Sequence, residues 1–313
     1  MKGVPADLDA LCAGGKAALA RTLSAVESHA GDAGLASLLD AAFAAQKGVV
    51  IGLTGPPGVG KSSLVNVLVA RLRAGGRSVG IIAVDPSSRR SRGALLGDRT
   101  RIESDPEDAG TFVRSMAARE RLGGLADLTF PAAVLMRAVF DMVIVETVGV
   151  GQSETDVTDV ADIVVFCVQP GSGDALQFMK AGVTEVPDLV LVTKGDTGAA
   201  AARAAADVKG ALSLGAAEAA AVMIGASQTG DGIAAALGAV EARLHGLAAA
   251  GTLDRRRAEQ GRIWCEGRLR ESFGSEGIRW IAGPPGEAMT PFASHARRRD
   301  RALSALRRGA ESG

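Results

Sequence analysis

Residues 55–62 read GPPGVGKS, and this stretch decides the fold of the chain. It follows the apolar run 49–54 and precedes the apolar run 63–69, an order that predicts a strand, a glycine-rich turn and a helix. In that setting the pattern G-x-x-x-x-G-K-[ST] is a phosphate-binding loop. Gly58 and Gly60 lack Cβ, so the backbone can adopt positive φ and bring several N–H groups close to one anion. The N-terminus of the following helix adds its positive dipole end.

Two side chains of the loop can bind the phosphates and the metal ion of a nucleotide. Lys61 supplies a mobile positive charge for phosphate oxygens, and Ser62 offers a hydroxyl to Mg²⁺. The residues of this stretch that we expect to contact a nucleotide are Gly55, Pro56, Pro57, Gly58, Val59, Gly60, Lys61, Ser62 and Ser63.

The composition is that of an ordinary globular chain of 313 residues, with 47% hydrophobic residues and a formal net charge of zero. Zero net charge and few aromatic residues argue against a nucleic-acid partner. No apolar run is long enough to cross a membrane, and no export or transit signal is evident. Cys12, Cys167 and Cys265 form no metal-binding pair. We therefore expect a cytoplasmic protein without a membrane or nucleic-acid partner.

Apolar runs of strand length recur along the chain, and they are continuous rather than alternating. Such runs are typical of strands buried on both faces of a mostly parallel sheet, so the predicted fold class is α/β. Ligands of such sheets bind beyond the carboxyl ends of the strands. The runs that predict strands are 49–54, 79–84, 142–145, 163–168, 189–192 and 222–224.

The changes of pattern along the chain predict three parts. Residues 1–46 predict a helical extension packed on the main domain, because residues 6–46 have helical spacing with a break at 31–34 that divides them into two helices. Residues 47–250 form the nucleotide-binding domain. Residues 251–313 form a C-terminal helical arm, to about residue 273, followed by a loosely ordered tail. The basic tail could touch nucleic acid, but we favour a solvated helix face.

The run 191–196, read as LVTKGD, selects among nucleotides. Asp196 can accept hydrogen bonds from N1–H and the 2-amino group of guanine, and adenine has neither donor. The aliphatic stem of Lys194 can lie over the purine face. Ala226, Ser227 and Gln228 follow the last predicted strand, and their N–H groups could reach guanine O6. This arrangement is the [NT]KxD guanine motif, so the sequence predicts GTP and GDP as ligands.

Two acidic residues follow predicted strands at the same edge. Asp85 lies in AVDPSS and Glu146 in VETVGVGQSE. Mg²⁺ is held by few carboxylates together with phosphate oxygens, and Ser62 with these acids matches that need. Gly149 would lend its N–H to the γ-phosphate, so the loop around it could sense hydrolysis. The alternative for either acid is a helix N-cap or a turn residue.

The motifs GPPGVGKS, AVDPSS, LLGDRTR, VETVGVGQSE and Thr193–Asp196, in this order and spacing, resemble the MeaB/ArgK family of G proteins. These are chaperones of adenosylcobalamin-dependent methylmalonyl-CoA mutase. The resemblance covers about residues 35–247 and extends to DRRRAEQ in the arm. It implies a P-loop GTPase fold of the SIMIBI class with helical N- and C-terminal extensions, and homodimerisation through the C-terminal arm.

The resemblance also implies roles for matching positions. Lys61 and Ser62 would contact phosphates and Mg²⁺, and Asp196 would select guanine. Thr193 stands where many members have Asn. We therefore expect a weaker contact between the base loop, residues 193–196, and the phosphate loop, residues 55–62. Asp85, Asp98 and Glu146 would line the metal and the switch region, and Gly149 and Gln152 would lie in the switch. The candidate catalytic residues are Lys61, Asp85, Asp98 and Gln152, the last three as alternatives for orienting the attacking water.

The expected function is therefore a magnesium-dependent GTPase that gates cofactor loading and protection of a B12-dependent acyl-CoA mutase. A nickel metallochaperone GTPase would require a His-rich tract or a C-x-x-C pair, and this chain has three scattered His residues and no Cys pair. A kinase of a periplasmic binding protein would need a phosphoacceptor that nothing in the chain supplies. A scaffold that binds GTP without turnover is the non-enzymatic alternative.

Overall fold

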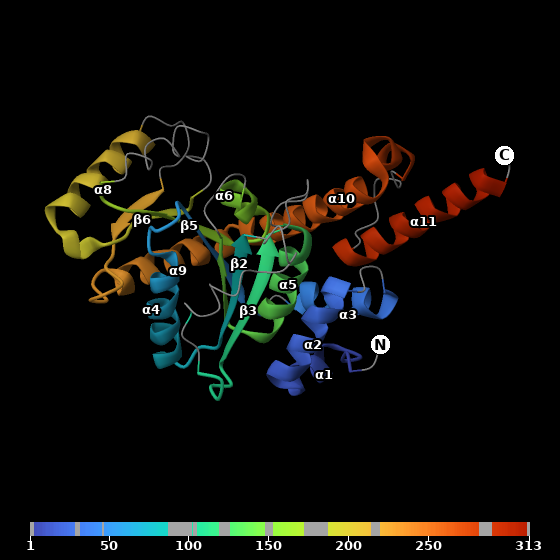
Figure 1. The fold of residues 1–313 in the computed structure, drawn as a ribbon, viewed down its shortest axis with the longest axis horizontal. Coiled ribbons are helices and arrows are strands. Elements are labelled where there is room, and N and C mark those ends of the chain that lie inside the picture. Colours follow the sequence, from blue (N-terminus) through green and yellow to red (C-terminus); the bar gives the residue numbers. More distant parts are fainter. Residues whose placement is uncertain are drawn as a thin grey trace.

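The structure, a computed structural model, describes residues 3–28, 32–45, 47–86, 102, 105–118, 126–147, 153–171, 187–213, 220–281 and 290–311. Its centre is a β-sheet with helices around it (Figure 1). The sheet has seven strands in the order β3-β2-β4-β1-β5-β6-β7. All of its strand pairs are parallel, which confirms the predicted α/β class. The strands are β1 (Val49–Thr54), β2 (Val79–Pro86), β3 (Thr111–Ala118), β4 (Met142–Glu146), β5 (Ile163–Val168), β6 (Leu189–Val192) and β7 (Ala221–Ile224).

Helices surround this sheet in the part of the chain that the structure describes. They are α1 (Leu8–Ala13), α2 (Gly15–Ser28), α3 (Ala33–Ala45), α4 (Lys61–Ala74), α5 (Ala126–Val139), α6 (Ser153–Asp156), η1 (Val157–Asp159), η3 (Gly195–Thr197), α8 (Ala199–Leu212), α9 (Ile233–Ala249), α10 (Thr252–Ile281) and α11 (Pro291–Glu311). None of these helices is by itself long and apolar enough to cross a membrane, although α9 and the first part of α10 pass that test as a bent pair.

The strands are apolar throughout because both faces of the sheet are covered. Ile51 and Leu53 of β1 pack in one core with α4 and α9, whereas Val50 faces a second core with α5 and the N-terminal helices. α8 packs over β5 and β6 and forms a third, smaller core with them. Successive side chains of a strand point to opposite faces, so a strand between two helical layers needs an apolar residue at every position. The continuous runs in the sequence have this cause.

The six predicted strands are confirmed, and β3 is a strand that the sequence did not predict. It reads TFVRSMAA and contains Arg114 and Ser115. Among the described strands, β3 lies at the edge of the sheet and pairs only with β2. An edge strand is partly exposed and tolerates polar residues, so it lacks the apolar signature of the inner strands. Arg114 forms an ion pair at 2.6 Å with Glu27 of α2, which brings the N-terminal extension to this edge.

In the N-terminal extension α2 and α3 pack on α5 of the main domain, and the described residues form three helices instead of the two predicted. α1 ends at Ala13, and Gly15 has a φ of 58°. Glycine adopts this left-handed conformation without steric cost, so the chain can turn between α1 and α2. α2 ends at Ser28 and α3 begins at Ala33, within the break predicted at residues 31–34, and residues 29–31 lie outside the described residues.

The C-terminal tail differs from the expectation of a loosely ordered segment, because Pro291–Glu311 form α11. α11 packs against α10 and α3 (Figure 1). Phe292 lies 4.6 Å from Trp264 of α10 between ring centroids. The carboxylate of Asp40 in α3 accepts hydrogen bonds from the N–H groups of Phe292 and Ala293. This helix was not predicted because charged residues dominate its sequence. The residues that hold it in place belong to α10 and α3.

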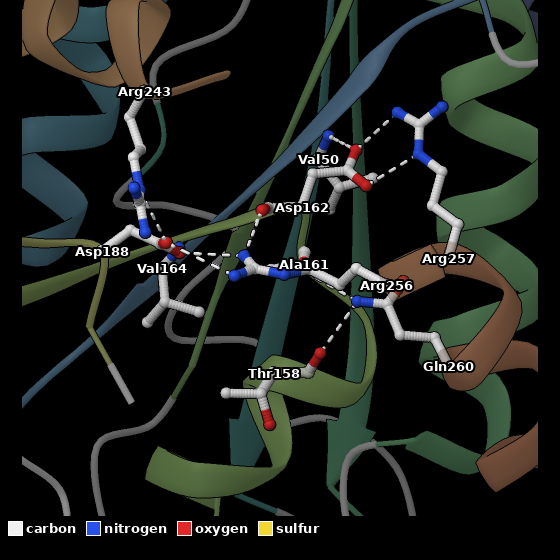
Figure 2. Close-up of polar contacts among 10 residues, drawn as sticks. All are labelled: Val50, Thr158, Ala161, Asp162, Val164, Asp188, Arg243, Arg256, Arg257 and Gln260. Atoms are coloured by element: carbon white, nitrogen blue, oxygen red, sulfur yellow. Dashed lines mark hydrogen bonds and ion pairs between the residues drawn. The ribbon is translucent and has the colours of Figure 1, made fainter. Parts of the chain in front are cut away.

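The arm helix α10 is fixed to the amino-terminal ends of β1, β5 and β6 (Figure 2). Arg257 donates two hydrogen bonds to the carboxylate of Asp162, at 2.7 and 2.8 Å, and both side chains are buried. Asp162 also accepts a hydrogen bond from the N–H of Val50 in β1. Arg256 makes an ion pair of 2.9 Å with Asp188, which precedes β6. The arm is therefore attached at the end of the sheet opposite the phosphate loop.

Candidate functional site

The phosphate loop connects β1 to α4, as predicted from residues 55–62. Its three glycines Gly55, Gly58 and Gly60 have φ values of 128°, 74° and 98°. A Cβ on Gly55 would lie 2.2 Å from the carbonyl oxygen of Cys167, whereas one on Gly58 or Gly60 would meet nothing within 4 Å. Backbone conformation therefore requires glycine at Gly58 and Gly60, and the close approach to β5 adds a second reason at Gly55.

Lys61 is the first residue of α4, and its side chain is buried. Its Nζ donates to the carbonyl oxygens of Gly55 at 2.7 Å and Pro56 at 3.0 Å. The ammonium is thus held inside the loop, where backbone N–H groups and the helix N-terminus also carry positive potential. This is the position from which a lysine contacts the terminal phosphates of a nucleotide.

Ser62 and Glu146 lie together, although 84 residues separate them in the chain. The hydroxyl of Ser62 donates to Oε1 of Glu146 at 2.7 Å, because α4 begins beside the end of β4. Hydroxyl and carboxylate oxygens are ligands that Mg²⁺ prefers. Among the described residues no three or more His, Cys, Asp and Glu side chains gather as a metal site. The pair fits Mg²⁺, which takes few protein ligands and completes its shell with phosphate and water.

Thr193 joins the base loop to the phosphate loop. Its buried hydroxyl lies 2.7 Å from the carbonyl oxygen of Val59 and 2.9 Å from that of Val168. A hydroxyl has one proton, so the two carbonyls share a single donor. The contact expected to be weakened by threonine is therefore present and ties the base loop to β5 and to the phosphate loop at one point.

The two base-side loops lie next to each other after β6 and β7. The N–H of Gly195 donates to the carbonyl oxygen of Gly225 at 3.0 Å, and that of Gly225 donates to Val192 at 2.9 Å. Asp196 is exposed in η3, so its carboxylate is accessible to a ligand. The N–H of Ala226 donates to Asp231 at 2.9 Å, which leaves those of Ser227 and Gln228 as the candidates for guanine O6.

Some predicted site residues fall outside the described residues. These are Asp98, Gly149 and Gln152, and their roles stay predictions. Asp85 is described only through its backbone, at the end of β2. In that strand Ala83 pairs with Glu146 of β4, so Asp85 comes two residues later at the same edge of the sheet.

Sequence reasoning missed two contacts that shape the site. Thr54 and Thr147 are buried threonines at the ends of β1 and β4, and their hydroxyls lie 3.1 Å apart. Gln169 follows β5, and its Oε1 accepts a hydrogen bond from Nζ of Lys194. No single motif contains both members of either pair. The only signal was position, since polar residues directly after buried parallel strands lie at the ligand-binding edge.

Burial raises the pKa of one group beneath the phosphate loop and of another in η1, beside the arm helix α10. The Cys167 thiol, buried beneath the phosphate loop, has a pKa raised to about 12 by burial, with Lys61 opposing and Glu146 adding to the rise. It is a neutral core residue. The pKa of Asp159 in η1 is raised to about 6, first by burial and then by the charges of Asp156 and Glu259.

Asp159 predicts a pH dependence of stability. Its folded-state pKa exceeds its ordinary value of 3.8, so between these values the folded chain is protonated while the unfolded chain is ionised. Stability therefore falls as pH rises through that window. Asp159→Asn, neutral at every pH, is expected to raise the unfolding temperature more at about pH 8 than at about pH 5. Thermal unfolding at both values, with the exposed Asp207→Asn of α8 as control, checks this. An equal effect at both pH values would contradict it.

A model of the family described as "Methylmalonyl Co-A mutase-associated GTPase MeaB" matches residues 19–276. The Mus musculus protein named "Methylmalonic aciduria type A homolog, mitochondrial" is 35% identical over 229 residues, which cover 71% of this chain and 55% of that protein. A Mycobacterium bovis protein named as a probable GTPase is 35% identical over 229 residues, with coverage of 71% and 68%. The crystal structure of a LAO/AO transport system kinase superposes with a TM-score of 0.66 at 27% identity, and the match covers 88% of this chain and 87% of that chain.

The chain spans about half the length of the mouse protein and of two Pyrococcus proteins that it also matches. The matched residues 19–276 include the phosphate loop, the Ser62–Glu146 pair and both base-side loops. The match of sequence, fold and site shows that the chain belongs to the MeaB family of methylmalonyl-CoA mutase-associated GTPases.

Proposed function

We propose that this protein hydrolyses GTP to GDP and phosphate and serves as a chaperone of an adenosylcobalamin-dependent methylmalonyl-CoA mutase or a related acyl-CoA mutase. The observation that carries the nucleotide part is the Thr193–Val59 contact of 2.7 Å, which unites a base-reading loop and a phosphate loop in one site. Family membership and the mouse relative support the mutase part.

The chain's own residues would contribute mainly position and charge. Lys61 and the loop N–H groups would neutralise charge on the terminal phosphates, and Asp196 would hold the guanine edge. Mg²⁺, held by Ser62 with Glu146 beside it, would add further neutralisation of phosphate charge when bound. Asp85, Asp98 and Gln152 are the candidates for orienting the attacking water. A slow intrinsic rate that a partner increases is the expected behaviour of such a site.

Nucleotide state would control the partner through the segment that begins at Glu146. Glu146 contacts Ser62 at the metal-binding end of α4, and the chain continues from it into residues 148–152 and then α6. Loss of the γ-phosphate would change what this segment can bind. We propose that this change gates cofactor loading and protection in the mutase. A homodimer formed through the C-terminal arm and a cytoplasmic location belong to the same proposal.

A pull-down tests the proposed function most directly. The tagged protein is incubated with a native extract in GDP or in a non-hydrolysable GTP analogue, and bound proteins are identified by mass spectrometry. We expect a B12-dependent acyl-CoA mutase to be enriched in a nucleotide-dependent manner. Lys61→Ala, which should not bind nucleotide, is the control that should lose this dependence. Recovery of no B12 enzyme in either state would remove the mutase assignment, and recovery of a nickel enzyme would favour the metallochaperone alternative.

Asp196→Asn should change the base preference. The carboxylate accepts two hydrogen bonds from guanine, and the amide can donate to the C2 oxygen of xanthine instead. We expect affinity for GDP to fall by about tenfold to a hundredfold. Affinity for xanthosine diphosphate (XDP) should rise. Competition binding with a fluorescent nucleotide measures both. Asp207→Asn, an exposed carboxylate of α8, is the control. A variant that kept its preference for GDP would contradict the base assignment.

A further inference from the structure

Lys194 has an unusual backbone. It is the one non-glycine residue with a positive φ in the part of the chain that the structure describes, at φ 54° and ψ 42°. The left-handed region is unfavourable for residues with a Cβ and persists only where neighbours enforce it. Here the carbonyl oxygen of Lys194 accepts hydrogen bonds from the N–H of Thr197 at 3.0 Å and from its hydroxyl at 2.8 Å. The backbone of the base loop is therefore fixed independently of the lysine side chain.

The side chain of Lys194 is held separately, by Gln169. Its Nζ donates to Oε1 of Gln169, the residue directly after β5. β5 and β6 are neighbours, with Val168 opposite Val192 in the register, and the N–H of Thr193 extends the pairing to Val168 at 2.7 Å. Gln169 therefore lies beside the base loop at the ligand-binding edge of the sheet.

A long lysine side chain loses conformational freedom when it binds a purine. Fixing it before the ligand arrives reduces that loss, which is the usual benefit of preorganisation. We propose that Gln169 is a positioning residue of the guanine site, and that it holds the Lys194 side chain where its stem meets the purine face. This inference rests on the proposed GTP-binding function and assigns to Gln169 a role in nucleotide affinity.

A purely structural role for the Gln169–Lys194 contact would have little effect on binding. Both side chains are at least partly exposed, and exposed polar pairs contribute little to stability. A positioning role predicts something different, namely a loss of nucleotide affinity without a loss of stability. It also predicts the same loss of affinity for GDP and for inosine diphosphate (IDP), whose base lacks the 2-amino group of guanine. The reason is that a lysine stem over the purine face does not contact that group.

The test compares Gln169→Met, which keeps the length but removes the acceptor, with Gln169→Glu, which keeps an acceptor for the ammonium. Dissociation constants for GDP and IDP, KM and kcat for GTP, and the unfolding temperature are measured for each. Gln169→Met is expected to raise both dissociation constants by about threefold to tenfold and to raise KM more than it lowers kcat. Gln169→Glu is expected to bind within about twofold of the wild type, because the acceptor is retained.

The outcomes separate this inference from the proposed function. Wild-type protein that bound no guanine nucleotide would overturn the proposed function and the role of Gln169 with it. Wild-type binding with an unchanged dissociation constant for Gln169→Met would overturn the role of Gln169 alone. A loss in Gln169→Glu equal to that in Gln169→Met would also overturn it, because the acceptor would then be irrelevant. A lowered unfolding temperature that accounts for the affinity loss would assign a structural role instead.

Discussion

Lys61→Ala is expected to remove most of the binding of GDP and GTP while the protein stays folded. The ammonium of Lys61 is buried at the start of α4 and is held by the carbonyl oxygens of Gly55 and Pro56, so it is placed to meet phosphate oxygens. Truncating one partner of a buried, hydrogen-bonded charge pair costs about 2–5 kcal/mol, which is roughly thirtyfold to several thousandfold in affinity. Isothermal titration calorimetry with GDP measures the loss.

Lys47 supplies a matched control for this variant. It precedes β1, whereas Lys61 follows that strand, and its Nζ contacts the carbonyl oxygen of Val139 rather than the loop. Lys47→Ala should therefore bind nucleotide like the wild type. Circular dichroism should show that both variants fold. Unchanged affinity in Lys61→Ala would contradict the phosphate-loop assignment, on which the whole functional proposal depends.

Arg257→Ala is expected to lower the free energy of unfolding by about 3–5 kcal/mol, the usual cost of leaving a buried charge without its partner. The Arg257 and Asp162 side chains are 3% and 0% exposed, so water cannot replace the lost contact.

Asp162→Ala should lower the free energy of unfolding by more than Arg257→Ala does. Arg137 is also buried nearby, and its pKa is lowered to about 10 by burial and by the charge of Arg257, with Asp162 opposing. Removing Asp162 would leave Arg257 without its carboxylate and would also remove a negative charge that favours the charged form of Arg137.

Urea denaturation measures these changes, provided that the slope with urea is the same for all variants. Arg262→Ala is the control on the same helix, because its ion pair with Glu259 is about half exposed and should contribute less than about 1 kcal/mol. A double variant, Arg257→Leu with Asp162→Leu, should recover part of the loss because no charge of the pair stays buried. A loss in this double variant equal to the sum of the losses in Arg257→Leu and Asp162→Leu alone would contradict the pairing.

The loops of the candidate site could be predicted from the sequence because each depends on a short local pattern. The phosphate loop needs glycines and a lysine at fixed spacing, and Asp196 needs only to follow a buried strand. Glu146 could be placed near Ser62 because both follow strands, and the carboxyl ends of parallel strands meet at one edge. The structure brings their oxygen atoms to 2.7 Å. Gln169 could not be found in this way, since its partner Lys194 belongs to the neighbouring strand and no motif joins them.

The sequence by itself determined the phosphate loop, the guanine motif and the inner strands, because these are encoded by residue spacing and continuous burial. Only the tertiary structure decided where the edge strand β3 pairs, how α11 docks, and which carboxylate holds the arm. Arg257 and Asp162 are 95 residues apart, and an arginine in a charged helix gives no sign that it will be buried. Such contacts depend on the order and register of strands, which are set by the packing of the whole chain rather than by any local pattern.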